Sequence, residues 1–313
     1  MPISVSGSKQ KIMMNWIKKH GGLCVLLCYI CWGFLPIYWK QIDSLDPVYI
    51  LSGRIFWSVI FCGILLLVTG QAGKAKEALK DKGEALRLFF AGVAVCINWG
   101  LYIYAVVNDH VLDGSLAYYM CPLFTIGLAF LFYKERLSGL QLLSLAIALA
   151  GILAVIFAHG EFPWLAVIIG MSFAVYSTIK KRVKAEGLVS TFVESLFLSP
   201  LALAYMVWAE GNGTGALAAL EGAELLYLPL SGVVTAIPLL FFAYGVKHIS
   251  MALAGILMYV NPTLQMLVGI LVYGEELDPS RMVLFACVWA ALILFVWSNN
   301  RKSKGKELRT ERE

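Results

Sequence analysis

Ten long apolar stretches alternate with short polar connectors along this 313-residue chain. Each stretch holds about 18 to 25 residues, the length that an α-helix needs to cross the hydrocarbon core of a bilayer. They cover residues 22–40, 47–69, 88–108, 112–133, 139–158, 162–179, 188–208, 225–246, 250–273 and 281–298. The pattern predicts an all-α integral membrane protein with ten transmembrane helices.

The stretch from Gly114 to Leu137 recurs without a gap 140 residues later, from Ala254 to Leu277. The matched pairs are Tyr119 with Tyr259, Pro122 with Pro262, Leu131 with Leu271, Tyr133 with Tyr273, Glu135 with Glu275 and Leu137 with Leu277. Each copy has a proline in its middle, which a membrane helix tolerates where water or neighbouring groups satisfy the freed carbonyl. The repeat predicts two related spans that line a pore.

The third and eighth spans match at the same offset. Chance alignment of leucine-rich helices is the alternative explanation, and the shared offset argues against it. Since each half holds five spans, an odd number, the second half must cross the membrane in the opposite direction, as inverted repeats of secondary transporters do. The predicted organisation is a cytoplasmic segment 1–21, a first repeat 22–158, a second, inverted repeat 162–298 and a basic cytoplasmic tail 299–313.

Charged residues predict the orientation. With the N-terminus inside, all of the 25 Lys and Arg residues except Lys40, Arg54 and Arg281 fall at the cytoplasmic ends of spans, as the positive-inside rule requires. The net charge of +5 therefore reflects membrane orientation and not a nucleic-acid partner. With 60% hydrophobic residues and a mean hydropathy of +0.77, the chain is too apolar for a soluble core of ordinary size. Both termini are predicted to be cytoplasmic.

The sequence lacks the motifs of common enzymes. Its four histidines stand at span ends in different connectors, and its seven cysteines lie within apolar runs with no metal-ligand spacing. We therefore expect no enzyme activity, no cofactor and no metal site. A channel, or a receptor or scaffold without active transport, is the alternative to a carrier, and saturable solute exchange would separate them.

Polar groups and prolines near the middle of the spans are the first candidates for a substrate cavity. The prolines are Pro122, Pro238 and Pro262, and the amides are Asn98, Asn261 and Gln265. A kink that only improves packing, or a hydrogen bond between helices, is the alternative explanation for each of them. Deep aromatic side chains could form the cavity walls or pack between helices: Trp32, Trp99, Tyr118, Tyr119 and its repeat partner Tyr259.

Arg54 and Glu194 are ionisable residues inside spans, and they too are 140 residues apart. A charge at the centre of a membrane helix costs about 2.5 to 3.5 kcal/mol on insertion scales, so such residues usually face a bundle interior. The inverted repeat predicts opposite membrane sides for the two, which argues against a salt bridge between them. Glu194 is a candidate for proton coupling and Arg54 for attracting an anion; local pairing or snorkelling is the alternative.

Three strings resemble a known family: WGFLPIYWK from Trp32 to Lys40, NWGLYIYAV from Asn98 to Val106, and NPTLQMLVGILVYGEEL from Asn261 to Leu277. They are similar to the RarD family of EamA-type permeases in the drug/metabolite transporter superfamily. The resemblance implies a bacterial inner-membrane permease of ten helices in two inverted EamA repeats, linked to chloramphenicol sensitivity. It also favours export. One departure is Gly53 before Arg54, where family members tend to carry a histidine.

These observations predict a secondary transporter that moves a small organic solute, a metabolite or an amphipathic drug such as chloramphenicol, by alternating access. Spans one to four and six to nine would form the cavity, with spans five and ten outside it. The expected partners are the substrate, the lipid bilayer and a coupling ion, and the expected assembly is a monomer or a weak dimer.

Overall fold

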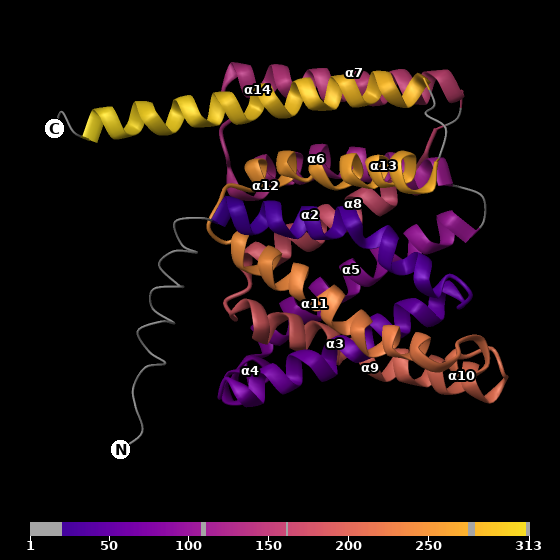
Figure 1. Cartoon of the computed structure of the whole chain (residues 1–313). Helices are drawn as coiled ribbons and strands as arrows, with labels where there is room; N and C mark the ends of the chain where they lie inside the picture. The colour runs from indigo at the N-terminus through magenta and orange to yellow at the C-terminus, as the bar shows by residue number, and fades with distance from the viewer. Residues whose placement is uncertain (1–20, 108–110, 161, 275–278, 311–313) are drawn as a thin grey trace. The chain divides into compact units, whose positions relative to one another are not determined.

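A computed structural model describes residues 21–107, 111–160, 162–274 and 279–310, which form α-helices and short 3-10 helices with no strand among them (Figure 1). The predicted spans correspond to α2 (Gly21–Trp39), α3 (Pro47–Val68), α5 (Lys82–Val107), α6 (Val111–Tyr133), α7 (Gly139–His159), α8 (Trp164–Arg182), α9 (Gly187–Gly211), α11 (Tyr227–Gly245), α12 (Met251–Leu257) with α13 (Val260–Tyr273), and α14 (Pro279–Thr310). The prediction of an all-α fold is confirmed. The predictions made for residues 1–20, 311–313 and Glu275 lie outside the described residues.

Within this described part, nine helical segments are long and apolar enough to cross a membrane. The tenth predicted span, α8, is not among them because its last turn carries Lys180, Lys181 and Arg182. The helix nevertheless stands at the predicted position and is 19 residues long. Its basic end is central to the candidate site described below.

The polar connector between α3 and α5 contains a helix of its own. This helix is α4 (Ala72–Lys80), which buries Ala75 and Ala78 against a cluster that includes Leu66 and Val193. The two alanines are three residues apart and so share one face of a helix. Charged residues cover the other face, which is why the segment does not look like a span. The connector between α9 and α11 also contains two short helices, α10 (Ala216–Ala219) and η2 (Gly222–Leu226).

The chain forms two compact units. The first, unit 1, comprises Met1–Cys96 and Tyr176–Ser250, and the second, unit 2, comprises Ile97–Val175 and Met251–Glu313. The chain passes from one unit to the other within α5, within α8 and just before α12. Each unit thus combines helices from both predicted repeats, so the repeats describe related sequence and the units describe packing.

In unit 1, α11 packs against α2 and α3, and α9 packs against α3. The Asp46 carboxylate caps α3 by accepting from the backbone N–H groups of Val48 and Tyr49, and Pro47 occupies the first turn, where its missing N–H costs nothing. The backbones of α3 and α11 come close together at Gly232, which lies beside the backbone of Trp57. Small residues at such crossings let two backbones touch.

In unit 2, α7 and α14 run side by side, and α12 packs against α6 (Figure 1). Glu135, just past the end of α6, joins the two repeated spans: its carboxylate accepts from the backbone N–H groups of Met251 and Ala252 at 2.8 and 3.0 Å. A carboxylate is favourable at a helix start because it satisfies unpaired N–H groups. The glutamate that marks the first repeat element therefore fixes the start of the second.

The ninth span runs from Met251 to Tyr273 and is interrupted near its central proline. Met258 and Tyr259 form a turn between α12 and α13, and Pro262 falls in the first turn of α13. A proline clashes with the carbonyl four residues earlier, here that of Met258, so ending the helix before that point relieves the clash. In the first copy, by contrast, α6 continues through Pro122.

Candidate functional site

The structure divides the candidates of unit 2 into buried and half-buried residues. Asn98 is buried, and its Nδ2 donates to the carbonyl of Ile169 at 2.8 Å. Tyr119 and Tyr259 belong to a hydrophobic core formed with α7 and α14, where Tyr119 meets Phe285 edge to face at 5.7 Å. These three side chains are placed to hold the unit together.

Half-buried candidates of unit 2 are better placed to meet a solute. Trp99 and Tyr118 are half-buried, and Tyr118 meets Tyr102 edge to face at 5.1 Å between ring centroids. Gln265 is also half-buried, and its Nε2 donates to Asn261 Oδ1 at 3.0 Å. This amide pair stands on the first turns of α13, directly after the break in the ninth span.

The three candidate prolines are all buried. Pro122 lies in α6 and Pro262 in α13, both in unit 2, and Pro238 lies in α11 of unit 1. An outward-facing proline in these spans would have contradicted a role in a cavity. Their burial is compatible both with that role and with helix packing.

Unit 1 contains a buried ion pair that the sequence had not revealed. Lys180 Nζ donates to Glu194 Oε1 at 2.6 Å, and the two side chains are 0% and 5% exposed. From the sequence, Lys180 was counted among the basic residues at the cytoplasmic ends of spans. It lies in the last turn of α8, and its ammonium group reaches the carboxylate of Glu194. Glu194 is therefore paired locally, which was the alternative to a role in proton coupling.

Aromatic rings and an unpaired hydroxyl surround this ion pair. The Lys180 ammonium lies 5.7 Å from the ring centroid of Tyr176, and Tyr176 stacks on Phe242 at 5.8 Å. Phe242 in turn meets Trp32, a candidate from the sequence, at 6.1 Å. One turn before Glu194, the Thr191 hydroxyl is buried and has no hydrogen-bond partner among the described residues. We use the name ammonium cluster for the set Lys180, Glu194, Tyr176, Phe242, Trp32 and Thr191.

Arg54 is held by a different environment in the same unit. Its Nε donates to Thr235 Oγ1 at 3.1 Å, and its guanidinium lies 4.7 Å from the ring centroid of Trp39. The side chain is 8% exposed. Thr235 belongs to α11 and Trp39 to α2, so Arg54 links three helices of the unit.

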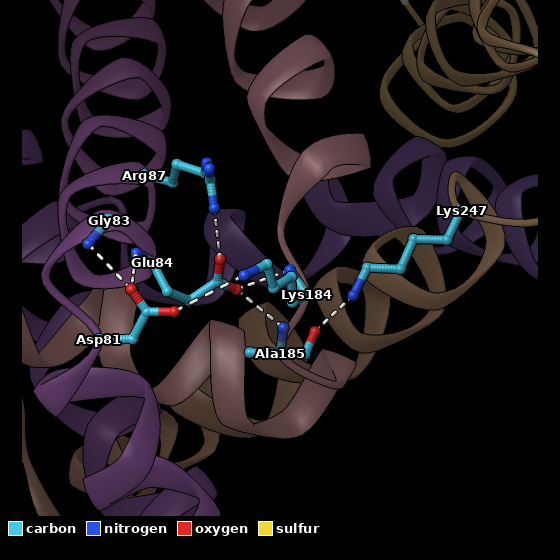
Figure 2. Close-up of polar contacts among 7 residues, drawn as sticks. All are labelled: Asp81, Gly83, Glu84, Arg87, Lys184, Ala185 and Lys247. Carbon is cyan, nitrogen blue, oxygen red and sulfur yellow. Dashed lines mark hydrogen bonds and ion pairs between the residues drawn. The ribbon is translucent and has the colours of Figure 1, made fainter.

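A second polar network lies around the connector between α8 and α9, and Figure 2 shows it. The buried Glu84 carboxylate accepts from the backbone N–H groups of Lys184 and Ala185 at 2.6 and 2.8 Å, and Arg87 Nη1 donates to its other oxygen at 3.1 Å. Asp81 caps the start of α5. Its carboxylate accepts a hydrogen bond from the backbone N–H of Glu84, and this bond holds the pKa of Asp81 below its ordinary value. Lys247 Nζ donates to the carbonyl of Ala185.

We expect Glu84→Ala to lower the free energy of unfolding by about 1 to 3 kcal/mol, because it leaves two backbone N–H groups without an acceptor. Chemical or thermal unfolding of the purified protein in detergent measures the change. Glu77→Ala, on the exposed face of α4, is the matched control and should change stability little. Equal effects of the two substitutions would contradict the role given to Glu84.

Lys247, in the connector between α11 and α12, should make stability depend on pH. Burial lowers the pKa of Lys247 from 10.5 to about 8, and the charge of Lys180 acts in the same direction. Between these values the unfolded chain binds a proton that the folded chain does not, so the free energy of unfolding should rise from about pH 8 to pH 10.5. Subtracting the pH profile of Lys247→Met from that of the native protein isolates this rise. A difference that is flat across the window would contradict it.

Sequence reasoning missed Lys180, Tyr176, Thr191 and Glu84. A signal for Lys180 was present: only a short connector separates α8 from α9, so the long side chain of a lysine near the end of one helix can reach toward a glutamate two turns into the next. The run Lys180, Lys181, Arg182 concealed it, because such a run usually marks a solvated span end. Nothing in the sequence pattern distinguished Thr191 or Tyr176 from core residues.

Known proteins show the same organisation. The model of the EamA-like transporter family matches residues 19–157 and 163–297. "Uncharacterized transporter YojE" of Bacillus subtilis is 38% identical over 283 residues, 90% of this chain and 94% of its own length. "Protein RarD" of Escherichia coli is 31% identical over 290 residues, which cover 91% of this chain and 98% of the relative. "Chloramphenicol-sensitive protein RarD" of Pseudomonas aeruginosa is 30% identical over 290 residues, which cover 91% of this chain and 96% of the relative. A solved crystal structure shares the fold at a TM-score of 0.70 and 15% identity, covering 90% of this chain and 98% of that one.

Proposed function

This chain belongs to the EamA-like transporter family, and from that premise we propose that it is a bacterial inner-membrane secondary transporter of a small organic solute that works by alternating access. Its homologues are named as transporters, so the chain is a multi-pass membrane transporter. The proposal adds the mechanism, the kind of solute and the location of both termini in the cytoplasm. It also takes the sequence repeats 22–158 and 162–298 as the two inverted halves of the carrier.

One observation carries the proposal: the regular α-helix of the ninth span is interrupted between α12 and α13, and the buried Asn261 and the half-buried Gln265 form an amide pair just after the interruption. Secondary transporters commonly bind their substrates at discontinuous helices, because the break exposes backbone groups and helix ends to the ligand. We propose that these amides, with Trp99 and Tyr118, contact the solute.

Solute exchange in proteoliposomes tests the carrier proposal. Chloramphenicol is the first probe, because a relative carries it in its name; a panel of metabolites follows, chosen by their thermal stabilisation of the purified protein. We expect saturable uptake that accelerates when unlabelled solute is present on the other side. A conductance that grows linearly with concentration would identify a channel, and the absence of any flux would favour a scaffold.

The amide pair gives the proposal a test at the level of residues. Gln265→Ala should lower the apparent affinity for a transported solute at least about tenfold, because one or two hydrogen bonds to the solute are lost. Asn212→Ala, which removes an exposed amide after α9, is the matched control and should leave the affinity unchanged. Thermal shift against solute concentration measures both. Unchanged affinity in Gln265→Ala would remove the pair from the substrate path.

Proton coupling through Glu194 is a second candidate role. The favouring observation is that its carboxylate is buried against Lys180, so its charge must be balanced whenever that pair opens. Solute uptake driven by a pH gradient, compared between the native protein and Glu194→Gln, tests it. Transport and pH dependence that both survive the substitution would exclude the role.

A further inference from the structure

We propose that the ammonium cluster is a binding site for an organic ammonium ion, and that the ammonium group of Lys180 occupies this site as a built-in substitute. The site would take a primary or secondary amine with an aromatic body. This inference rests on the proposed function in taking the chain to be a carrier. It concerns a second site, in unit 1, whereas the amide pair belongs to unit 2, and it names the chemical class of ligand for that second site.

The geometry around the Lys180 nitrogen is that of a cation site. Glu194 Oε1 lies 2.6 Å from it on one side, and the Tyr176 ring centroid lies 5.7 Å from it on another. A carboxylate and an aromatic face together are the usual receptors for ammonium ions in proteins. What binds one ammonium group binds another of the same size.

The Thr191 hydroxyl is an independent indication of a ligand. It is 1% exposed, it stands one turn before Glu194 on α9, and it accepts and donates no hydrogen bond among the described residues. An unsatisfied buried hydroxyl costs about 1 to 3 kcal/mol by protein mutational data. An ammonium ion carries two or three N–H donors, so an amine at Glu194 has a donor left for Thr191.

Aromatic rings beyond Tyr176 define the body of the ligand. Phe242 stacks on Tyr176, and Tyr29 and Trp32 meet Phe242 at 6.2 and 6.1 Å. These rings come from α2, α8 and α11 and are buried, so the body of a ligand enters only by displacing packed side chains. Aromatic faces favour an arylalkylamine over a purely aliphatic amine as the occupant.

The ligand and the ammonium group of Lys180 compete for the place beside the Glu194 carboxylate. A buried carboxylate must keep a positive charge beside it, so the ligand can enter only as Lys180 leaves. In the first repeat the counterpart of Lys180 is Lys40, which is more than half exposed and pairs with Asp43 at the surface. The counterpart of Glu194 is Arg54, a cation, so the carboxylate that an ammonium site requires is present at one of the two related positions.

Phenethylammonium, with uncharged phenethyl alcohol as its control, tests the inference by thermal shift of the purified full-length protein. In Lys180→Ala the ligand should bind with an apparent Kd at least about tenfold lower than in the native protein, because the internal competitor is gone. The double variant Lys180→Ala/Glu194→Gln should lose this binding, and phenethyl alcohol should not replace the ion. Equal effects of the ion and the alcohol would overturn the inference.

Thr191→Val keeps the test decisive if Lys180→Ala does not fold. It replaces a hydroxyl that has no partner with a methyl group of similar shape, so the protein should fold normally and bind phenethylammonium about fivefold more weakly, the loss of one hydrogen bond. Unchanged binding would count against the site. In proteoliposomes, exchange of an uncharged solute with no response to phenethylammonium would overturn this inference and leave the carrier proposal standing. Saturable ammonium binding without any solute exchange would do the reverse.

Discussion

Replacing Lys180 by methionine should lower the free energy of unfolding by about 3 to 5 kcal/mol, the usual cost of removing one partner from a buried ion pair. The lysine is fully buried and its nitrogen lies 2.6 Å from Glu194. Methionine fills most of the same volume, so packing contributes little to the loss. What remains is a carboxylate without a compensating charge in an apolar environment, and unfolding lets water reach it.

A double variant separates the charge from the packing. Lys180→Met combined with Glu194→Gln removes both charges, and we expect it to recover most of the stability, because replacing a whole buried pair with neutral groups is often neutral. Lys184→Met, whose side chain is 73% exposed, is the control for loss of a lysine and should change stability by less than about 1 kcal/mol. Unfolding in detergent measures all three. A single variant as stable as the Lys184 control would show that the pair does not hold α8 to α9.

The same pair shows where sequence reasoning succeeds and where it stops. Apolar runs long enough to span a bilayer predicted every long helix, because hydrophobic length is a strong local signal that does not depend on tertiary contacts. The partner of Glu194 could not be predicted in this way. The direction in which a lysine at a helix end points depends on what lies behind it, and the sequence of α8 alone cannot show that Glu194 of α9 is there.

Proline and charged connectors illustrate the same limit. Pro122 and Pro262 occupy equal positions in the repeat, yet α6 continues through one and the ninth span breaks before the other. The pattern shows that a helix is weakened at these points, and tertiary packing decides how the weakness is resolved. In α4, two buried alanines decide the structure of a segment that is otherwise polar. Among the candidates, Trp99, Tyr118 and Gln265 could be separated from Asn98, Tyr119 and Tyr259 only by their burial.

Among substitutions of a glycine by alanine, Gly232→Ala should lower the stability of the protein most. A Cβ atom at this position would overlap the carbonyl of Trp57 and come within 2.7 Å of the Ser58 nitrogen. Both are backbone atoms of α3, so no side-chain rotation can relieve the contact and the two helices must separate. Overpacking of this kind costs about 1 to 3 kcal/mol and more where the backbone must move, and we expect a loss at the upper end of that range.

Gly127→Ala is the control that isolates the clash. Gly127 also lies within a helix, α6, and a Cβ there would meet nothing within 4 Å. Alanine should stabilise this position by about 0.5 to 1 kcal/mol, because it restricts the unfolded chain more than glycine does. The two substitutions make the same chemical change, so their opposite signs would come from the contact with α3 alone. If Gly232→Ala were as harmless as Gly127→Ala, α3 and α11 would not approach as closely as the structure shows. The hydrogen bond from Ser58 Oγ to the Gly232 carbonyl, 3.3 Å at this crossing, should then also contribute nothing measurable.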